Sequence, residues 1–336
     1  MSLAELLGAL QRWPGIEQKT QVQRIVAGLQ GTAGDGRYPN GDDTAVIATE
    51  NGFDLLAMEG LFTPFVEADP WFAGWCSIMV NLSDVAAMGG RSVAVVNALW
   101  GRDNHDSAKI MAGMSDASKA FQVPIVGGHT HLSSDRLQLA VGVLGRANTL
   151  LSGFAAEPGH AIVAAIDLRG QYRPPFLNWN AATDAPTQRL RGDLELLPKI
   201  ADAGLAISAK DISQAGLLGT LVMLLECSEV GAEVELARIP RPASVDWLDW
   251  LTSFPSFGYL LTTPQGQVEA LLRIFRERDI SADCIGVVQP GSQLNVHYQE
   301  ESGLFWDTSV RPLTGMGPSA SAVADSARAN EAERCA

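Results

Sequence analysis

Acidic side chains at a few points of this sequence have the residue type and the neighbours needed to bind a metal ion. The candidates are carboxylates that end predicted strands or interrupt an apolar helix: Asp42, Asp43, Glu59, Asp84 and Asp211. Two ionised carboxylates about 4 Å apart repel by ~4 kcal/mol at an effective dielectric of 20, so a cluster of them persists only beside cations. If the fold brings these side chains together, magnesium is implied.

The segment 79–90, MVNLSDVAAMGG, predicts the C-terminal half of a helix that begins near Pro70 and stops at two glycines. Its large apolar residues recur at helical spacing and form a packing face, whereas Asn81 and Asp84 fall on a second stripe. An apolar helix buries a carboxylate only when something compensates the charge. Asn81 and Asp84 either serve chemistry or cap neighbouring loops, and the motif alone leaves both readings open.

The common phosphate-binding motifs do not occur. No GxxxxGK[ST] is present, and no GxGxxG follows a predicted strand. The formal net charge of −14 would repel a phosphate backbone, so we expect no nucleic-acid partner. An acidic protein still binds ATP when the nucleotide arrives with magnesium, because its carboxylates then bind the metal.

Length and composition favour a globular protein of about two domains. The 336 residues are 46% hydrophobic and 18% charged. No window approaches the ~18 uncharged apolar residues of a membrane span, and Glu5 stands where a secretory leader would be positive, so we expect a cytoplasmic protein without a membrane partner. The cysteines are scattered without CxxC spacing and are expected to be reduced: Cys76, Cys227, Cys284 and Cys335.

Predicted strands and helices alternate along most of the chain. Up to residue 150 the pattern indicates strands at 44–49, 53–58, 92–99, 123–126 and 137–144, with helices at 17–29, 70–88 and 107–121. A second unit follows with strands at 161–167, 205–209, 258–263 and 284–288, and helices at 190–203, 213–226 and 265–278. We therefore predict domains at 1–150 and 151–314, and a disordered tail at 315–336.

Four motifs together resemble one superfamily. GDDTAV at 41–46, NLSDVAAMGG at 81–90, VGGHT at 126–130 and DISQAGLLGTL at 211–221 occur in the order and at roughly the spacings of AIR synthase, thiamine-monophosphate kinase and selenophosphate synthetase. The whole chain is most similar to AIR synthase-related proteins whose substrate is not established.

The resemblance implies a two-domain α/β (α+β) fold in which the N-terminal domains of two subunits pair into a shared β-barrel. It further implies a homodimer that binds ATP and Mg²⁺ in a cleft. Carried over by motif, the magnesium ligands would be Asp42, Asp43, Glu59, Asp84 and Asp211, of which Asp84 and Asp211 would act in catalysis. A nucleotide-binding role would fall to Asn81 and to a turn made of Gly127, Gly128, His129 and Thr130.

The departures from the family pattern concern the chemistry. His129 replaces the aspartate of the kinase GGDT, and Gln214 replaces the second aspartate of DxSDG, so two metal-binding carboxylates are missing. A spacing of two residues also allows His129 and His131 to be metal ligands, although a turn-stabilising or nucleotide-contacting role is the stronger expectation for His129. The segment 31–36 has no cysteine, which weakens the resemblance to selenophosphate synthetase.

Our leading interpretation is an ATP- and Mg²⁺-dependent enzyme that uses or transfers the γ-phosphoryl group on a small-molecule substrate. The alternatives are a non-catalytic nucleotide-binding or assembly subunit and a selenophosphate-synthetase-like enzyme. The loop 170–186, which carries Arg173, Phe176 and Trp179, either contacts a ligand or packs at the domain seam.

Overall fold

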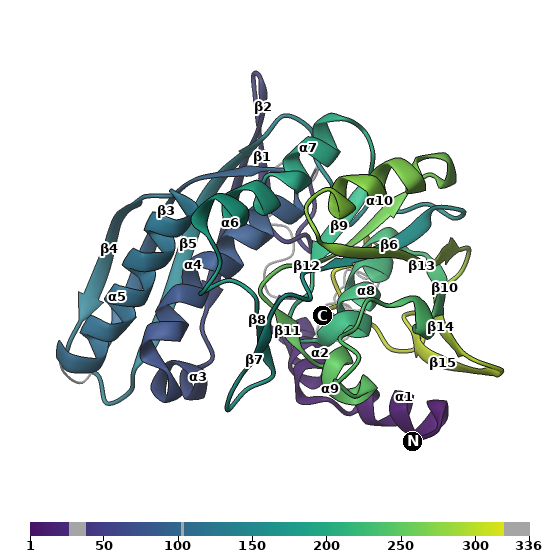
Figure 1. Cartoon of the computed structure of the whole chain (residues 1–336), viewed down its shortest axis with the longest axis horizontal. Helices are drawn as coiled ribbons and strands as arrows, with labels where there is room; N and C mark the ends of the chain where they lie inside the picture. The colour runs from purple at the N-terminus through teal and green to yellow at the C-terminus, as the bar shows by residue number, and fades with distance from the viewer. Residues whose placement is uncertain (27–37, 102–103, 319–336) are drawn as a thin grey trace, which may run out of the picture.

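The computed structural model describes residues 1–26, 38–101 and 104–318, which form two α/β units side by side (Figure 1). Each unit has its own sheet, and a small third sheet lies near the seam. None of the described helices is long and apolar enough to cross a lipid bilayer.

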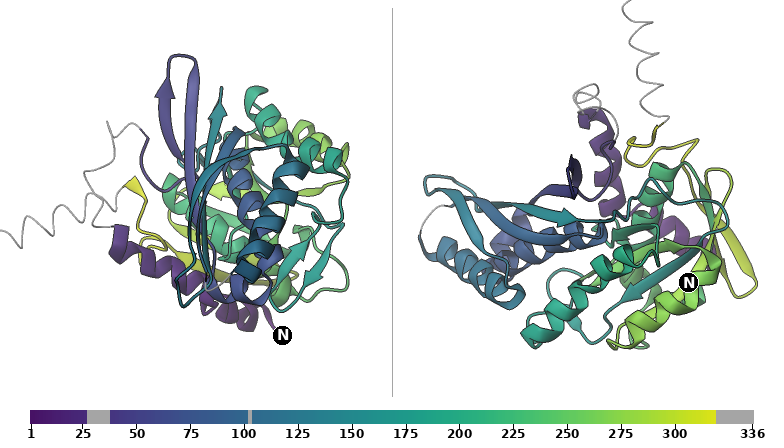
Figure 2. Two further views of the ribbon diagram at one scale, coloured as in Figure 1. Left: turned by 90° about the vertical axis from the view of Figure 1, so that its left-hand side faces the viewer. Right: turned by 90° about the horizontal axis from the view of Figure 1, so that it is seen from above.

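The first unit is a five-stranded sheet in the order β1-β2-β5-β3-β4. The strands are β1 (Ala45–Thr49), β2 (Gly52–Gly60), β3 (Arg91–Trp100), β4 (Ile125–His131) and β5 (Gln138–Ala147). Helices α3 (Thr63–Ala68), α4 (Pro70–Ala87) and α5 (Asn104–Phe121) complete the unit. Because α4 and α5 cover one face of the sheet, inward residues such as Leu55, Val95 and Val143 are buried (Figure 2). The opposite face stays open.

Helix α4 forms where the sequence predicts it. Pro70 begins the helix, and the Asp69 side chain accepts a hydrogen bond from the Phe72 backbone N at 3.2 Å. The chain leaves the helix through Gly89, whose φ of +76° suits glycine. Nearly every residue of α4 is buried because the sheet, α5 and the second unit surround it.

The second unit is a seven-stranded sheet in the order β15-β14-β10-β13-β6-β12-β9. Its strands are β6 (Ala161–Ile166), β9 (Ser208–Asp211), β10 (Gly231–Glu235), β12 (Gly258–Thr263), β13 (Ser281–Gln289), β14 (Gln293–Tyr298) and β15 (Glu301–Asp307). Its helices are α6 (Thr187–Leu194), α7 (Leu196–Asp202), α8 (Gly216–Ser228), α9 (Trp247–Leu251) and α10 (Val268–Arg276).

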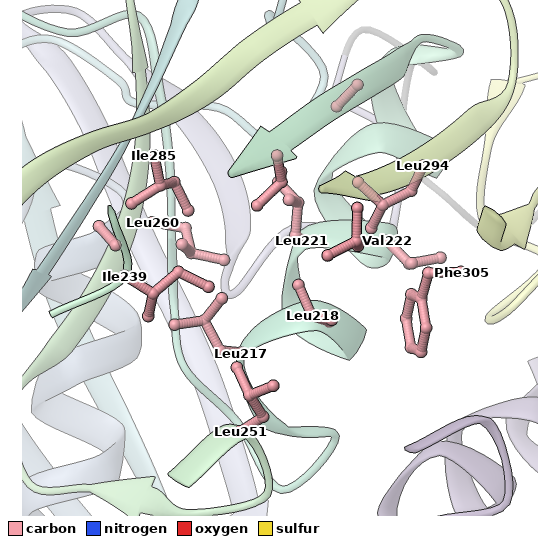
Figure 3. Packing of buried hydrophobic residues seen from close by; sticks show 14 of the residues in the cluster. Leu217, Leu218, Leu221, Val222, Ile239, Leu251, Leu260, Ile285, Leu294 and Phe305 are labelled. Carbon is pink, nitrogen blue, oxygen red and sulfur yellow. The ribbon is translucent and has the colours of Figure 1, made fainter. Parts of the chain in front are cut away.

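Helices cover both faces of this second sheet. Strand β6 is buried throughout: Ile162 and Ala164 point into a core with α8, and Val163 and Ala165 into one with α7 and α10. Figure 3 shows the first of these cores, where leucines of α8 meet side chains from the sheet. Such double burial explains why β6 reads as a continuous apolar run rather than an alternating one.

Two N-terminal helices pack on the second unit rather than the first. Leucines of α1 (Leu3–Gln11) lie in the core with α8, and α2 (Pro14–Val26) packs against α8. The domain boundary at residue 150 stays a prediction. Helices α1 and α2 precede that boundary in the sequence, but they pack on the second unit. The small sheet consists of β7 (Gln171–Arg173), β8 (Asn178–Asn180) and β11 (Phe254–Pro255).

Several predicted boundaries were wrong. The helix expected at 190–203 is broken at Glu195 into α6 and α7. The helix expected from residue 213 begins at Gly216, because the Gly216 backbone N bonds the Ser213 carbonyl at 2.9 Å in a turn. The strand expected at 205–209 runs instead over β9, which places Asp211 at its end.

The predicted tail at 315–336 is described only as far as residue 318. Glu226 on α8 accepts hydrogen bonds from the backbone N of Leu313, Thr314 and Gly315 at 3.0, 2.9 and 2.7 Å. The start of the segment is therefore attached to α8, and residues 319–336 lie outside the described part of the chain.

Candidate functional site

The predicted acidic residues come together where the two units meet. Asp43 precedes β1, Glu59 ends β2, Asp84 lies on α4 and Asp211 ends β9. Asp84 is close enough to the other three for their charges to raise its pKa. Residues from both units thus form one acidic cluster, as the sequence analysis required for a cation site.

Asp84 is the least compensated member of the cluster. It is only 7% exposed, and its Oδ2 has no hydrogen-bond partner among the described residues. Burial, followed by the charges of Asp211 and Glu59, holds the pKa of Asp84 well above its usual value. A carboxylate that capped a neighbouring loop would accept a hydrogen bond through this oxygen, so the geometry favours a chemical role.

Asn81 lies one helical turn before Asp84 and leaves a second oxygen without a partner. Its Nδ2 donates to the Ser77 carbonyl at 2.8 Å, which orients the amide, while Oδ1 is buried and unpaired. Unpaired buried polar atoms are rare in folded proteins because each costs about 1–3 kcal/mol. Helix α4 therefore carries two buried oxygens without a partner, and of their two residues Asp84 lines the cavity described below whereas Asn81 does not.

Asp211 and Glu59 have environments that also disfavour a charge. Burial, followed by the charge of Asp43, raises the pKa of Asp211 to about 8, even though Lys210 opposes the shift. Burial likewise raises the pKa of Glu59, against the charge of Lys19. Both carboxylates would ionise more readily once a cation was bound.

The two aspartates of the GDD loop have different environments. Asp42 accepts hydrogen bonds from Ser152 Oγ at 2.6 Å and from the Gly153 backbone N at 2.7 Å, so both its oxygens hold the 152–153 loop. Asp43 forms an ion pair with Lys210 and accepts a hydrogen bond from the Asp211 backbone N at 3.3 Å. Asp42 thus anchors the loop, and Asp43 joins the two units.

Lys210 is a functional candidate that the sequence analysis missed. It is only 3% exposed. Burial alone would lower its pKa, but the charges of Asp43 and Asp42 hold it above its usual value, so the ammonium stays charged. The signal that the sequence offered was adjacency in the chain, because Lys210 directly precedes the predicted site residue Asp211.

The residues present fit a divalent cation that arrives with phosphate. Within the described ranges, no three His, Cys, Asp or Glu side chains form a preformed metal centre. Magnesium, however, is usually held by one or two carboxylates together with substrate phosphates and water. The unpaired oxygen of Asp84 and the carboxylates of Asp211 and Glu59 are hard oxygen donors of the type this ion prefers.

The segment 127–130 lies away from the acidic cluster. Gly127, Gly128, His129 and Thr130 belong to the exposed edge strand β4, so the expected turn is a strand. Glu59 pairs with Val141, which pairs with Asn97, which pairs with Gly128. These three strand spacings amount to about 14 Å, so the segment does not reach the cluster of its own chain.

A cavity of about 570 Å³ opens from the acidic cluster. Glu59, Asp84 and Asp211 line one part of it, and aromatic side chains line another. Residues of the segment 170–186 pack at the seam: Arg173 Nε donates to Asp69 Oδ2 at 2.8 Å, and Trp179 is buried in the core that contains α8. Phe176 lines the cavity, and its contact with a ligand stays a prediction. The arrangement can place a metal-bound phosphate beside a second small molecule.

Comparison with known proteins matches most of the chain to one family. Residues 41–147 match the AIR synthase related protein N-terminal domain, and residues 176–299 match the C-terminal domain. An uncharacterized protein of Synechocystis sp. is 43% identical over 317 residues, which cover 93% of this chain and 98% of that protein. A thiamine-monophosphate kinase of Pyrococcus abyssi is 30% identical over 274 residues, covering 76% and 84%.

Solved structures agree on the fold. T. maritima PurL complexed with ATP superposes with a TM-score of 0.69 at 19% identity and covers 93% of this chain. This chain matches 55% of that PurL chain, or about half its length. Taken with the motifs, the two units and the acidic cluster between them, these matches show that the protein belongs to the AIR synthase-related protein family.

Proposed function

We propose that this protein is an ATP- and Mg²⁺-dependent enzyme that transfers the γ-phosphoryl group of ATP to a small molecule, or uses that group to activate it. The observation that carries the proposal is the buried, unpaired carboxylate of Asp84, which faces a cavity together with Asp211 and Glu59. The relative from P. abyssi is named a kinase, and the PurL structure of the same fold was solved with ATP.

The chain's own residues would divide the work between binding and positioning. Asp84, Asp211 and Glu59 would hold magnesium, which when bound neutralises phosphate charge. Asp43 would act through its ion pair with Lys210, which fixes β9 against the first unit.

The proposed phosphoryl transfer is a single displacement that needs no covalent enzyme intermediate. The bond from the γ-phosphorus to the β,γ-bridging oxygen breaks, a bond to an acceptor oxygen or nitrogen forms, and ADP leaves. The acceptor's proton passes to solvent water, because Asp211 is already engaged as one of the proposed magnesium ligands.

A homodimer forms part of the proposal. On the open face of the first sheet, Leu56, Met58 and Val96 are 51%, 70% and 43% exposed. Met58 on β2 and Val96 on β3 both pair with Gly142 of β5, which lies between these strands, and Leu56 is two residues before Met58 on the same face. His129 on β4 pairs with Ala98, two residues after Val96, and so lies on this face as well. Contiguous apolar surface of this kind commonly marks an interface, and a second subunit would cover it.

The rival candidate is a subunit that binds a nucleotide without turning it over. It is supported by His129 and Gln214, which, by the resemblance of their motifs GGHT and DISQA, stand where the kinases carry carboxylates. Binding alone would not separate the two candidates. Release of ADP or phosphate in the presence of a panel of small metabolites would establish the enzyme, whereas tight Mg²⁺-dependent binding without turnover would favour the subunit.

The direct test is nucleotide affinity in Asp84→Asn. The change keeps the shape of the side chain but removes the charge, so we expect affinity for ATP with magnesium to fall at least tenfold, by about 1.4 kcal/mol, while the melting temperature of the free protein is maintained. The matched control is Asp283→Asn, since Asp283 pairs with Arg238 on the surface of the second unit. A lower melting temperature with unchanged affinity would instead assign Asp84 a structural role.

A further inference from the structure

The cavity extends well beyond the carboxylates along one face of helix α4. Cys76, Val80 and Asp84 all line it and follow one another at intervals of four residues. At a rise of 1.5 Å per residue, Cys76 and Asp84 are about 12 Å apart along the helix axis. The space beyond Asp84 is thus deep enough for a second molecule whose reacting group lies at the carboxylates.

Interlocked aromatic rings form one wall of that deeper part. The Phe176 ring meets Phe62 and Phe65 edge to face, with centroid distances of 6.1 and 5.7 Å, and all three residues line the cavity. Phe62 is 42% exposed although it is a large apolar side chain. A wall of fixed rings favours a flat apolar ligand, because such a ligand buries area without ordering flexible groups.

The described lining has little positive charge to offer an anion. Lys19 is its only cationic residue, and its charge acts on the carboxylates of Glu59 and Asp211. Arg173 is nearby but already engaged: its Nε donates to Asp69, and its guanidinium lies 4.4 Å from the Phe72 ring centroid. A phosphate or carboxylate carried by the second molecule would therefore lose its hydration in the apolar part without gaining a partner.

Neutral polar groups complete the described lining. Asn178, Ser213, Gln214 and Thr252 offer amides and hydroxyls, which can orient a ligand through uncharged hydrogen bonds.

We propose that the acceptor for this site is a flat ring compound, neutral or cationic, and that the cavity discriminates against acceptors carrying their own phosphate or carboxylate. The inference rests on the proposed function, because it assumes that a metal-bound nucleotide occupies the acidic end. The inference concerns only the molecule bound at the aromatic end. The proposed function and the acceptor inference can therefore be tested separately.

The test uses matched ligands that differ only in charge. Titration calorimetry on the wild-type protein, with magnesium and a non-hydrolysable ATP analogue present, would compare indole-3-ethanol, tryptamine and indole-3-acetate. A second series would use 2-phenylethanol, phenethylamine and phenylacetate. We expect the neutral and cationic members to bind at least tenfold more tightly than the anionic member of each series. Equal or tighter binding of the acids, or no binding in either series, would overturn the inference.

Two variants identify where the ring binds. Phe176→Ala should weaken ring binding at least tenfold and leave affinity for the metal-nucleotide unchanged. Val80→Arg should reverse the preference in favour of the acids, because it adds a cation to the cavity face of α4. The control is Phe53→Ala, which removes a similarly half-buried ring that packs on Tyr38 outside the cavity.

The two proposals have separate failure modes. If Phe176→Ala weakens nucleotide binding as much as ring binding, the aromatic end holds the adenine and the acceptor inference is wrong. If the wild-type protein binds no nucleotide with magnesium, the proposed function itself fails, whatever the ring series shows.

Discussion

Two groups of buried acids in this protein are neutralised very differently. Asp167 and Asp193 lie in the second unit and are 3% and 4% exposed. Arg169 Nε donates to Asp167 at 2.8 Å, Arg278 Nε donates to Asp193 at 2.8 Å, and Arg189 lies within ion-pair distance of both. Three guanidinium groups thus surround two carboxylates.

The cluster at the seam between the units has the opposite balance. Asp43, Glu59, Asp84 and Asp211 interact there, and Lys210 is the buried cation that pairs with one of them. Burial of a charge is stable only with a well-matched partner. The comparison indicates that the arginine-rich group holds the fold together, whereas the seam cluster has an excess of negative charge that a ligand cation would neutralise.

The largest expected effect comes from breaking the arginine-rich group. Asp193→Ala leaves Arg169 and Arg278 without this partner, and we expect a loss of about 3–5 kcal/mol in the free energy of unfolding, measured in urea. Added magnesium and ATP should not selectively recover the loss. The exposed pair Arg238 and Asp283 is the control, because Asp283→Ala should cost under about 1 kcal/mol. A loss no greater than that of the control would contradict the structural assignment.

Removal of the lysine from the seam cluster should give a loss that magnesium repairs. Lys210→Met leaves the buried Asp43 without its ion-pair partner, so we expect destabilisation of about 3 kcal/mol in the free protein. A divalent cation bound by the cluster would replace the missing charge, so magnesium with ATP should stabilise this variant more than the wild type. Identical ligand-induced shifts in both proteins would show that the two groups of acids do not differ in this respect.

The pH dependence of stability should also separate the groups. The pKa of Asp211 is raised from 3.8 to about 8 in the folded protein. Between these values the folded state holds a proton that the unfolded state has lost, so stability is present at low pH and falls as pH rises towards 8. We expect the free energy of unfolding to fall by at most about 1.4 kcal/mol per pH unit. Urea unfolding at pH 6, 7 and 8 measures this loss.

Asp211→Asn removes the titrating carboxyl and provides the control for that measurement. Its stability should be flatter over the same range of pH. A wild-type stability that rises between pH 6 and 8 would contradict the assigned direction of the shift.

The smallest effect on stability is expected at the open face of the first sheet. Met58→Glu places a charge on the exposed apolar surface and should convert the proposed homodimer into a monomer, measured by light scattering at micromolar concentration. Val310→Glu is the matched control, because Val310 is 81% exposed and lies in the second unit. A wild-type monomer would contradict the dimer directly.

Much of the local structure and the identity of the acids could be predicted from the sequence. The apolar spacing and end residues of 70–90 predict helix α4, and that pattern isolates Asn81 and Asp84 from the packing face. These inferences succeed because helix periodicity, capping and the cost of burying a carboxylate depend on neighbours within a few residues.

Only the tertiary structure shows which of the acids act together. Asp42 and Asp43 are adjacent in sequence, yet one holds the 152–153 loop and the other pairs with Lys210. Similarly, the strand order places 127–130 about 14 Å from Glu59. The residues that form β9, and hence the face of the strand on which Lys210 lies, depend on the pairing of β9 with β12. These features depend on contacts between residues far apart in the chain, and local sequence patterns do not determine such contacts.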